Sequence, residues 1–244
     1  MFAYNAQVGC DKHGWALAYS IDAGNVHDSQ AFLALFEQLE RLQSDYLIAD
    51  SGYKTPSIAK FLLDQNITPV FPYTRPRGKK GKLRPKDFIY DDYYDCYLCP
   101  ENQVLAYSTT NRDGYREYKS DPKICAICPL LSSCTESKKK QKVVTRHIWR
   151  EYLEICEEIR HQKGSKELYQ KRKETVERLF GTAKEYHNLR YTREVGKSKM
   201  KAKVGLTLAC LNIKKLVKMM VGLSANIKKT NLKNDICFHY ESIN

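Results

Sequence analysis

The sequence predicts an α/β fold, because patterns typical of strands and of helices alternate along its first part. Two extended runs flank the turn-rich tetrad Asp11-Lys12-His13-Gly14, and two short apolar runs follow at 46–49 and 68–73. Residues at helical spacing separate these runs, and alternation of this kind is typical of a sheet covered by helices. With 244 residues, 42% of them hydrophobic, the chain can bury a core as one domain or as one domain with an insert.

The elements up to residue 73 follow from local patterns. Tyr4 to Ile21 predicts a β-hairpin, and Asp28 or Ser29 is the expected cap of the next helix. That helix has one apolar face, made of Phe32, Leu35, Phe36, Leu39 and Leu42. The run 46–49 predicts a buried strand that ends at Asp50. Thr55-Pro56 then opens a helix, and 68–73 returns as a strand.

The composition changes after residue 73, and this sets the expected domain organisation. Residues 74–82 are basic and rich in Pro and Gly, which predicts a linker into an insert that reaches to about 150. Helices are expected at 149–159, 168–189 and 198–220, the last with a broad apolar face. The predicted parts are therefore a core segment 1–73, a linker and cysteine-rich insert 74–150, core helices 151–221 and a polar, poorly ordered tail 222–244.

The charge balance favours a polyanionic partner. Lys and Arg number 41 against 28 Asp and Glu, a formal net charge of +13. A basic surface gains free energy by releasing phosphate counterions, so nucleic acid is the first candidate, and a basic surface without a dedicated partner is the alternative. No apolar run approaches the roughly 20 residues that span a bilayer, and the N-terminus has no signal-peptide pattern. We therefore expect no membrane partner and a cytoplasmic, nucleoid-associated protein.

Five of the nine cysteines are clustered. Cys96-x-x-Cys99 and Cys125-x-x-Cys128 form two knuckle-like pairs, and Cys134 follows closely. In a cytosolic chain this spacing predicts a structural Zn²⁺ held by four thiolates in a zinc-ribbon-like module, with one cysteine spare. Unbound thiols and an iron–sulfur cluster are the alternatives.

Two carboxylates are candidates for metal-dependent phosphoryl transfer, which needs hard oxygen ligands that converge on one point. Asp50 stands at the C-terminal end of a predicted central strand, where open α/β folds place their sites, although a turn or capping Asp would show the same pattern. Glu177 borders the buried face of a predicted helix. Lys173 and Lys184 project from nearly the same side of that helix and can grip phosphates, but a solvated charged face would look similar.

Seven basic residues are predicted to bind DNA without sequence specificity, because lysine and arginine near phosphates release counterions whichever bases lie above them. They come from the linker and from the helix that carries Glu177, and they are Arg75, Arg77, Lys79, Lys80, Lys82, Lys173 and Lys184.

Four motifs in order resemble landmarks of insertion-sequence transposases of the DDE type. They are Tyr4-Asn5-Ala6-Gln7-Val8, Gly24-Asn25-Val26-His27-Asp28, Ile48-Ala49-Asp50-Ser51-Gly52-Tyr53 and the run from Val176-Glu177 to Lys184. The resemblance implies an RNase H-like core, Asp50 and Glu177 as catalytic ligands of Mg²⁺ or Mn²⁺, and a cysteine-rich insert between the second and third carboxylates. It also implies action on transposon ends and target DNA by a homo-oligomer.

The resemblance also shows a missing carboxylate. The family's triad begins with an Asp on a first strand upstream of the Tyr-Asn-x-Gln hairpin, and this chain starts at that hairpin. The DNA-binding N-terminal region of the family is missing from this chain as well. The sequence is therefore expected to be a truncated form. Asp11 and Asp22 are the only nearby substitutes, one in a turn and one in a Gly-Asn loop.

A second departure is local. Some relatives place Tyr and Arg seven and four residues before the Glu, where this chain has Gln170 and Lys173. Tyr169 and Arg172 are each one residue out of register, so neither is carried over.

Two functions follow from these observations. The first is metal-dependent cleavage and strand transfer at insertion-sequence ends, with little turnover expected from the chain alone because one carboxylate is missing. The second is a catalytically inactive DNA-binding remnant. A zinc-ribbon protein unrelated to transposition is disfavoured by the contexts of Asp50 and Glu177.

Overall fold

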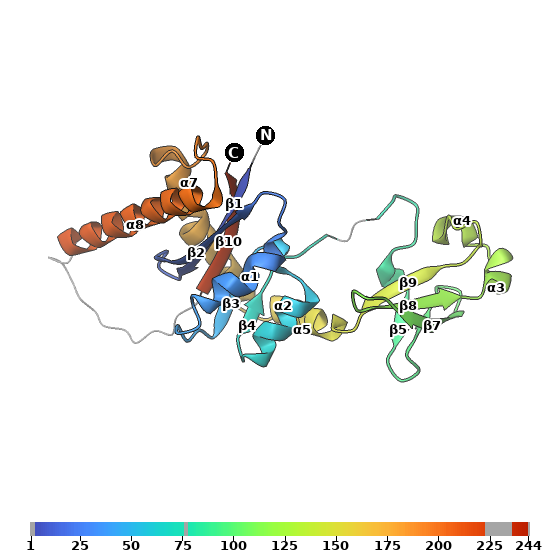
Figure 1. Ribbon diagram of the computed structural model, residues 1–244. Coiled ribbons are helices and arrows are strands. Elements are labelled where there is room, and N and C mark those ends of the chain that lie inside the picture. The colour runs from blue at the N-terminus through green and yellow to red at the C-terminus, as the bar shows by residue number, and fades with distance from the viewer. Residues whose placement is uncertain (1–2, 76–77, 223–235, 244) are drawn as a thin grey trace. The chain divides into compact units, whose positions relative to one another are not determined.

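A computed structural model describes residues 3–75 and 78–222 and the backbone of 236–243. The chain divides into two compact units, each described by itself (Figure 1). The first unit comprises Met1–Tyr73 and Tyr152–Asn244, and the second comprises Thr74–Glu151.

The first unit is built on a five-stranded mixed sheet in the order β2-β1-β10-β3-β4. Its strands are β1 (Tyr4–Asp11), β2 (Ala16–Ala23), β3 (Tyr46–Ile48), β4 (Thr68–Val70) and β10 (Ile236–Ile243). β1 pairs antiparallel with both β2 and β10, whereas β10, β3 and β4 run parallel. The predicted hairpin is confirmed, and Gly14 in its turn has a φ of 75° that suits glycine.

The prediction of a poorly ordered tail is wrong for residues 236–243. Residues 223–235 lie outside the described residues, but β10 occupies the middle of the core sheet between β1 and β3 (Figure 1). The run Ile236-Cys237-Phe238-His239-Tyr240 is rich in β-branched and aromatic residues, which favour strands. The strand could not be assigned to the core by pattern, because its partners lie far away in the sequence.

Helices cover both faces of this sheet. On one face α1 (Asp28–Glu37), α2 (Pro56–Asp64) and α5 (Arg150–His161) pack on Leu47 and Ala49. On the other face α7 (Arg178–Tyr186) and α8 (Lys197–Gly222) pack on alternate residues of β1 and on Ile48. This αβα arrangement confirms the predicted α/β class, and neighbouring residues of β3 serve opposite faces as strand geometry requires.

Two helix predictions need correction. The expected cap of α1 is wrong, because His27 caps it by accepting a hydrogen bond from the Ser29 amide, which leaves Asp28 in the first turn and buried. The helix expected at 168–189 is interrupted. It consists of α6 (Ser165–Arg172), a π-helical turn η3 (Lys173–Glu177) and α7.

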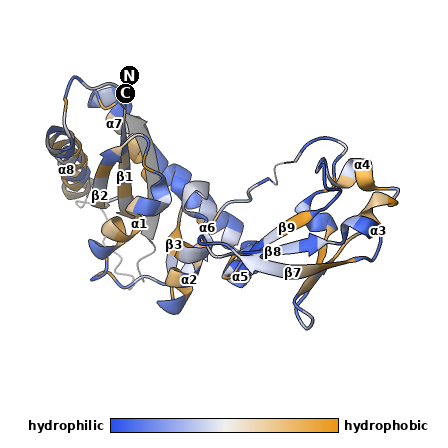
Figure 2. Ribbon diagram, turned by 45° about the vertical axis from the view of Figure 1, so that its right-hand side comes forward, coloured by the Kyte–Doolittle hydropathy of each residue, from blue (hydrophilic) through white to orange (hydrophobic). Residues whose placement is uncertain are grey.

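The apolar face of α8 is buried only in its first half. Met200, Val204 and Leu208 pack on the sheet, and Gly205 lies so close to Tyr19 of β2 that a Cβ would overlap its hydroxyl. The second half exposes Ile213, Leu216, Val217 and Met220, so the described residues do not cover the predicted apolar face there. Hydrophobic and hydrophilic residues are mixed along this helix (Figure 2).

The second unit is an antiparallel meander in which each strand pairs with the next along the chain. Its elements are η2 (Pro85–Asp87), β5 (Ile89–Asp91), β6 (Cys96–Leu98), β7 (Val104–Thr110), β8 (Tyr115–Ser120), α3 (Pro122–Ala126), α4 (Leu131–Cys134) and β9 (Val143–His147). Its small core is made of Phe88, Tyr97, Leu105, Tyr118 and Val144. Asp95 accepts hydrogen bonds from the hydroxyls of Tyr90 and Tyr118 at 2.8 and 2.6 Å, which ties three strands of the meander together.

None of the helices in the described part of the chain is long and apolar enough to cross a bilayer.

Candidate active site

Asp50 follows β3 and is held by the turn that begins there. It caps the 3₁₀ turn η1 (Ser51–Tyr53), and its Oδ1 accepts hydrogen bonds from the Ser51 amide and hydroxyl. Its Oδ2 lies 3.7 Å from Nη2 of Arg172. The capping alternative raised by the sequence is therefore observed, but it occupies one carboxylate oxygen and leaves the other directed at a buried cation.

Arg172 joins the two candidate carboxylates. Its side chain is 3% exposed, and its Nη1 lies 3.8 Å from Oε1 of Glu177 while Nη2 faces Asp50. Nη1 also donates a 2.8 Å hydrogen bond to the hydroxyl of Tyr169. Burial raises the pKa of Tyr169, so this phenol stays neutral and polar beside the guanidinium. Two carboxylates that are far apart in the sequence thus meet on one guanidinium.

The π turn explains why the sequence register failed here. Arg172 is five residues before Glu177, and an α-helix would align the residue four before it, Lys173, with that glutamate. Across η3 the extra residue of a π turn brings Arg172 to Glu177 instead, while Lys173 is exposed. Tyr169 and Arg172, which the sequence register did not carry over, lie beside Asp50 and Glu177 in the structure. Tyr169 and Arg172 stand one residue further from Glu177 than in the relatives' motif. One extra residue of this kind inside a helix indicates a π turn.

The first two motifs form a support for Asp50. The buried Asn5 and Gln7 of β1 donate side-chain hydrogen bonds to the carbonyls of Val26 and Asp28, at 3.2 and 3.4 Å. These amides fix the segment that enters α1. The strand motif and the Gly-Asn-Val-His-Asp motif are therefore in direct contact, which is a structural reason for these polar residues inside a sheet.

Asp28, the last residue of the second motif, contacts Gly52 of the third motif. Its carboxylate is buried and lies against Gly52, where a built Cβ would come within 2.2 Å of Oδ2. Only glycine allows this approach, and Gly52 is two residues after Asp50 in the turn that Asp50 caps. Asp28, which the sequence placed in the second motif and at the start of a helix, is thus a positioning residue for the turn at Asp50.

Gly52→Ala is expected to destabilise the first unit by about 1–3 kcal/mol, because the new methyl group would displace the Asp28 carboxylate or the turn. Gly181→Ala is the matched control. Gly181 lies inside α7 with open space around its Cβ position, so alanine there should stabilise by about 1 kcal/mol. Urea denaturation of both variants measures the difference, and equal free energies of unfolding would contradict the contact.

The two substitutes for a third carboxylate lie elsewhere. Asp11 accepts hydrogen bonds from the amides of His13 and Trp15 in the hairpin turn, and Asp22 pairs with Lys197 at 2.8 Å on the edge strand β2. Among the side chains that the structure describes, no three His, Cys, Asp or Glu residues come close enough together to hold a metal ion. The site therefore shows two carboxylates, Asp50 and Glu177, and one arginine.

Four of the five clustered cysteines share a location in the second unit. Cys99, Cys125, Cys128 and Cys134 line one small apolar pocket, and all are free thiols. Burial raises the pKa of the Cys134 thiol, and the other three raise it further. Cys96 does not line this pocket and is buried near Asp91 and Asp95. The four sulfurs are neighbours without the close grouping of a metal site.

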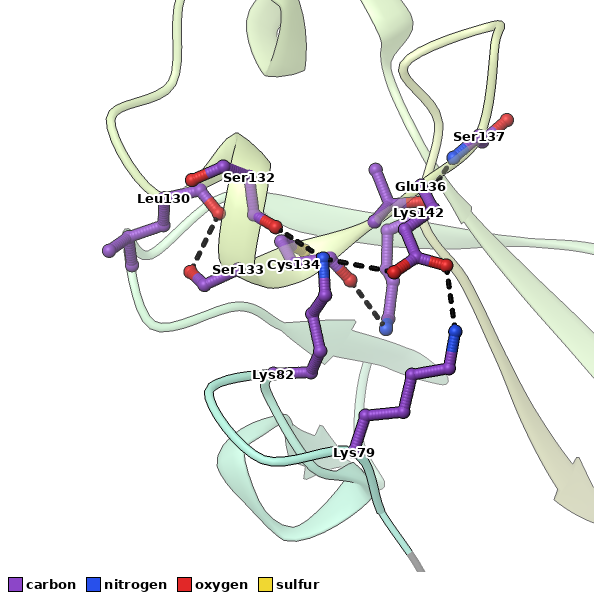
Figure 3. A network of polar contacts seen from close by, with 10 residues as sticks. Lys79, Lys82, Leu130, Ser132, Ser133, Cys134, Glu136, Ser137 and Lys142 are labelled. Carbon is purple, nitrogen blue, oxygen red and sulfur yellow. Dashed lines mark hydrogen bonds and ion pairs between the residues drawn. The ribbon is translucent and has the colours of Figure 1, made fainter.

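The basic linker belongs to the second unit and packs on its cysteine segment. Lys79 and Lys82 both pair with Glu136, at 3.0 and 3.2 Å, and Lys82 also donates to the carbonyl of Ser132 (Figure 3). The two lysines hold the pKa of Glu136 below its ordinary value. Arg75 and Lys80 are exposed, and the predicted residue Arg77 lies outside the described residues.

The comparison with protein families gives one match. Residues 98–217 match the family model described as Transposase DDE domain. This segment is similar to the transposase DDE domain. The match includes Glu177, Tyr169 and Arg172, as well as the four cysteines that share a pocket, whereas Asp50 precedes it. The family supports a function in transposition with DNA as the partner. No curated protein and no solved structure matches this chain.

Proposed function

We propose that this protein acts in DNA transposition by metal-dependent cleavage and transfer of DNA strands at insertion-sequence ends, in an RNase H-like core. The observation that carries the proposal is the meeting of Asp50 and Glu177 on the buried Arg172. The sheet supports the fold, since an antiparallel hairpin continues into three parallel strands and Asp50 follows the middle one of these.

The carboxylates fit a divalent cation with hard oxygen ligands, Mg²⁺ or Mn²⁺. When bound, such ions activate the attacking oxygen and stabilise the leaving oxygen. Asp50 is the rigid ligand because its turn fixes one oxygen, and Glu177, 40% exposed, is the ligand open to solvent. Arg172 keeps the two carboxylates near each other by balancing their charge. Lys173, Lys184 and the basic linker residues Arg75, Lys79, Lys80 and Lys82 remain proposed non-specific DNA contacts.

A catalytically inactive DNA-binding form is the second candidate. The observation that favours it is the absence of a third ligand beside Asp50 and Glu177 among the described side chains. The neighbouring strand β10 carries one carboxylate, Glu241, which pairs in register with Ala6, whereas His239 stands two residues beyond the Cys237–Ile48 pair and so at the level of Asp50.

Incubation of the purified chain with Mn²⁺ and DNA that carries the element's ends separates the two candidates. Cleavage that falls to background in Asp50→Asn and Glu177→Gln, but not in the exposed control Glu158→Gln, would support the enzyme. Glu241→Gln tests whether β10 supplies a third carboxylate. DNA binding without cleavage under these conditions would favour the inactive form, and cleavage unaffected by Asp50→Asn would refute the site.

We also propose a structural Zn²⁺ in the second unit, held by Cys99, Cys125, Cys128 and Cys134, because these thiols surround one pocket. The Cys99 sulfur also accepts a 3.4 Å hydrogen bond from the Gln103 amide, which fixes its position at the pocket. Cys96 is then the spare cysteine.

Elemental analysis of the purified protein is expected to find one zinc per chain. Cys128→Ser should lose the metal and lower the melting temperature of the second unit, whereas Cys96→Ser should keep it, although Cys96 lies in the same unit. Iron in place of zinc would identify a cluster. Metal-free protein, or equal loss in both variants, would contradict the proposed ligand set.

A further inference from the structure

A basic cleft lies in the first unit beside the candidate active site. It has a volume of about 590 Å³ and is lined by the hairpin turn at His13, by η3, by α7 and by the second half of α8. Its cations are Arg178, Lys214, Lys215 and Lys218, and its carboxylate is Glu174. The lining is therefore strongly positive, which suits a ligand with several negative charges.

The cations differ in how they are held. The Lys215 ammonium is anchored on the carbonyl of His13 and lies 5.2 Å from the centre of the Trp15 ring. Arg178 and Lys218 make no ion pair with another described residue, and Glu174 pairs with neither of them. One lysine thus shapes the wall of the cleft, while two cations remain available to a ligand.

The cleft is separate from the two carboxylates. Glu174, Thr175 and Arg178 line it, whereas Asp50, Arg172 and Glu177 do not. The π turn η3 therefore contributes to both places, with Glu177 directed to Arg172 and its neighbours lining the cleft. Arg178, which lines the cleft, is the residue directly after Glu177.

The walls also carry groups suited to a sugar–phosphate chain. The ring of Tyr186 is 78% exposed, with the Lys214 ammonium 6.0 Å from its centre, and Thr182 adds a neutral hydroxyl. The Asn212 amide is bonded to the backbone of Ala16 at both ends. A tyrosine hydroxyl, like lysine and arginine, is one of the groups that contact DNA phosphates. We propose that this cleft binds the sugar–phosphate backbone of DNA through Arg178 and Lys218. The identity of the polymer as DNA rests on the proposed function.

The test is DNA binding by the whole chain in EDTA, measured as fluorescence anisotropy of a labelled duplex over a range of salt concentrations. Each phosphate contact contributes about 0.9 to the slope of log K against log salt, so Arg178→Gln with Lys218→Gln should lower the slope by about 1.8. Lys199→Gln with Lys201→Gln is the matched control. Lys199 and Lys201 are exposed on α8, the helix that carries Lys218, and they lie outside the cleft. Their substitution removes the same charge as that of Arg178 and Lys218.

The expected result is a smaller slope in the cleft variant and a nearly unchanged one in the control. Equal slopes in the two variants would overturn the proposal, and so would competition by polyglutamate as effective as that by DNA of equal charge. Because EDTA removes divalent ions, binding is scored independently of cleavage. A chain that binds through the cleft but never cleaves would refute the proposed enzyme and leave the cleft intact.

Discussion

Cys237→Pro is expected to unfold the first unit or to remove most of its folding free energy. Cys237 is paired on both sides, with Cys10 of β1 and Ile48 of β3, so it lies in the interior of the sheet. Proline has no amide hydrogen to donate and is tolerated in sheets only at edges or bulges. Since a domain is stable by only about 5–15 kcal/mol, disruption of its central strand affects much of that total.

Cys237→Ser is the control, because it keeps the amide hydrogen and nearly the same side-chain size. Trp15 belongs to the first unit and Trp149 to the second, so urea unfolding followed by fluorescence in a Trp149→Phe background reports on the first unit alone. The serine variant should retain most of the parent stability. A proline variant with an unchanged midpoint would show that β10 does not occupy the middle of the sheet.

Arg172→Gln is expected to cost about 3–5 kcal/mol, the usual loss when one partner is removed from a buried ion pair. Glutamine leaves Asp50 and Glu177 facing each other without the cation that both contact. Arg172→Lys should recover only part of the loss, because an ammonium lacks the fork with which the guanidinium reaches two carboxylates and Tyr169. Urea denaturation at constant ionic strength gives the free energies of unfolding.

Arg190→Gln provides the comparison. Arg190 pairs with Glu185 on the surface, where the arginine side chain is 53% exposed, so its loss should cost less than about 1 kcal/mol. If Asp50 and Glu177 bind a divalent ion, Mn²⁺ should stabilise Arg172→Gln more than Asp50→Asn. Similar losses from Arg172→Gln and Arg190→Gln would contradict the bridging role of Arg172.

The support behind Asp50 gives the sequence motifs a physical meaning. Asn5 and Gln7 bind the backbone before α1, Asp28 lies on Gly52, and the turn containing Gly52 is capped by Asp50. Each motif therefore contacts the next, although each was predicted from its own local pattern. The resemblance located these residues but did not explain why polar side chains stand inside a sheet.

The sequence by itself determined the elements whose signals are local. The hairpin around Gly14, the capped start of α2 at Thr55, and β3 ending just before Asp50 were predictable from turn residues and short-range periodicity. The matched family was likewise visible in motifs that include Glu177. These features depend on neighbours a few residues apart, which a single sequence displays directly.

Only the tertiary structure decided which distant segments meet. β10 enters the sheet because its backbone groups find partners in β1 and β3, and no local pattern identifies a partner across most of the chain. Arg172 reaches Glu177 because a π turn absorbs one residue, a change of helical register that side-chain spacing in an ideal α-helix does not contain. Cys99 and Cys134 share a pocket that excludes Cys96. Both pack on the core that contains Tyr97, and Cys96, as the neighbour of Tyr97 in β6, points to the opposite face of the sheet. The pairing of strands, the register of a helix and the side of a sheet to which a side chain points are properties of packed elements. They are fixed when those elements come together.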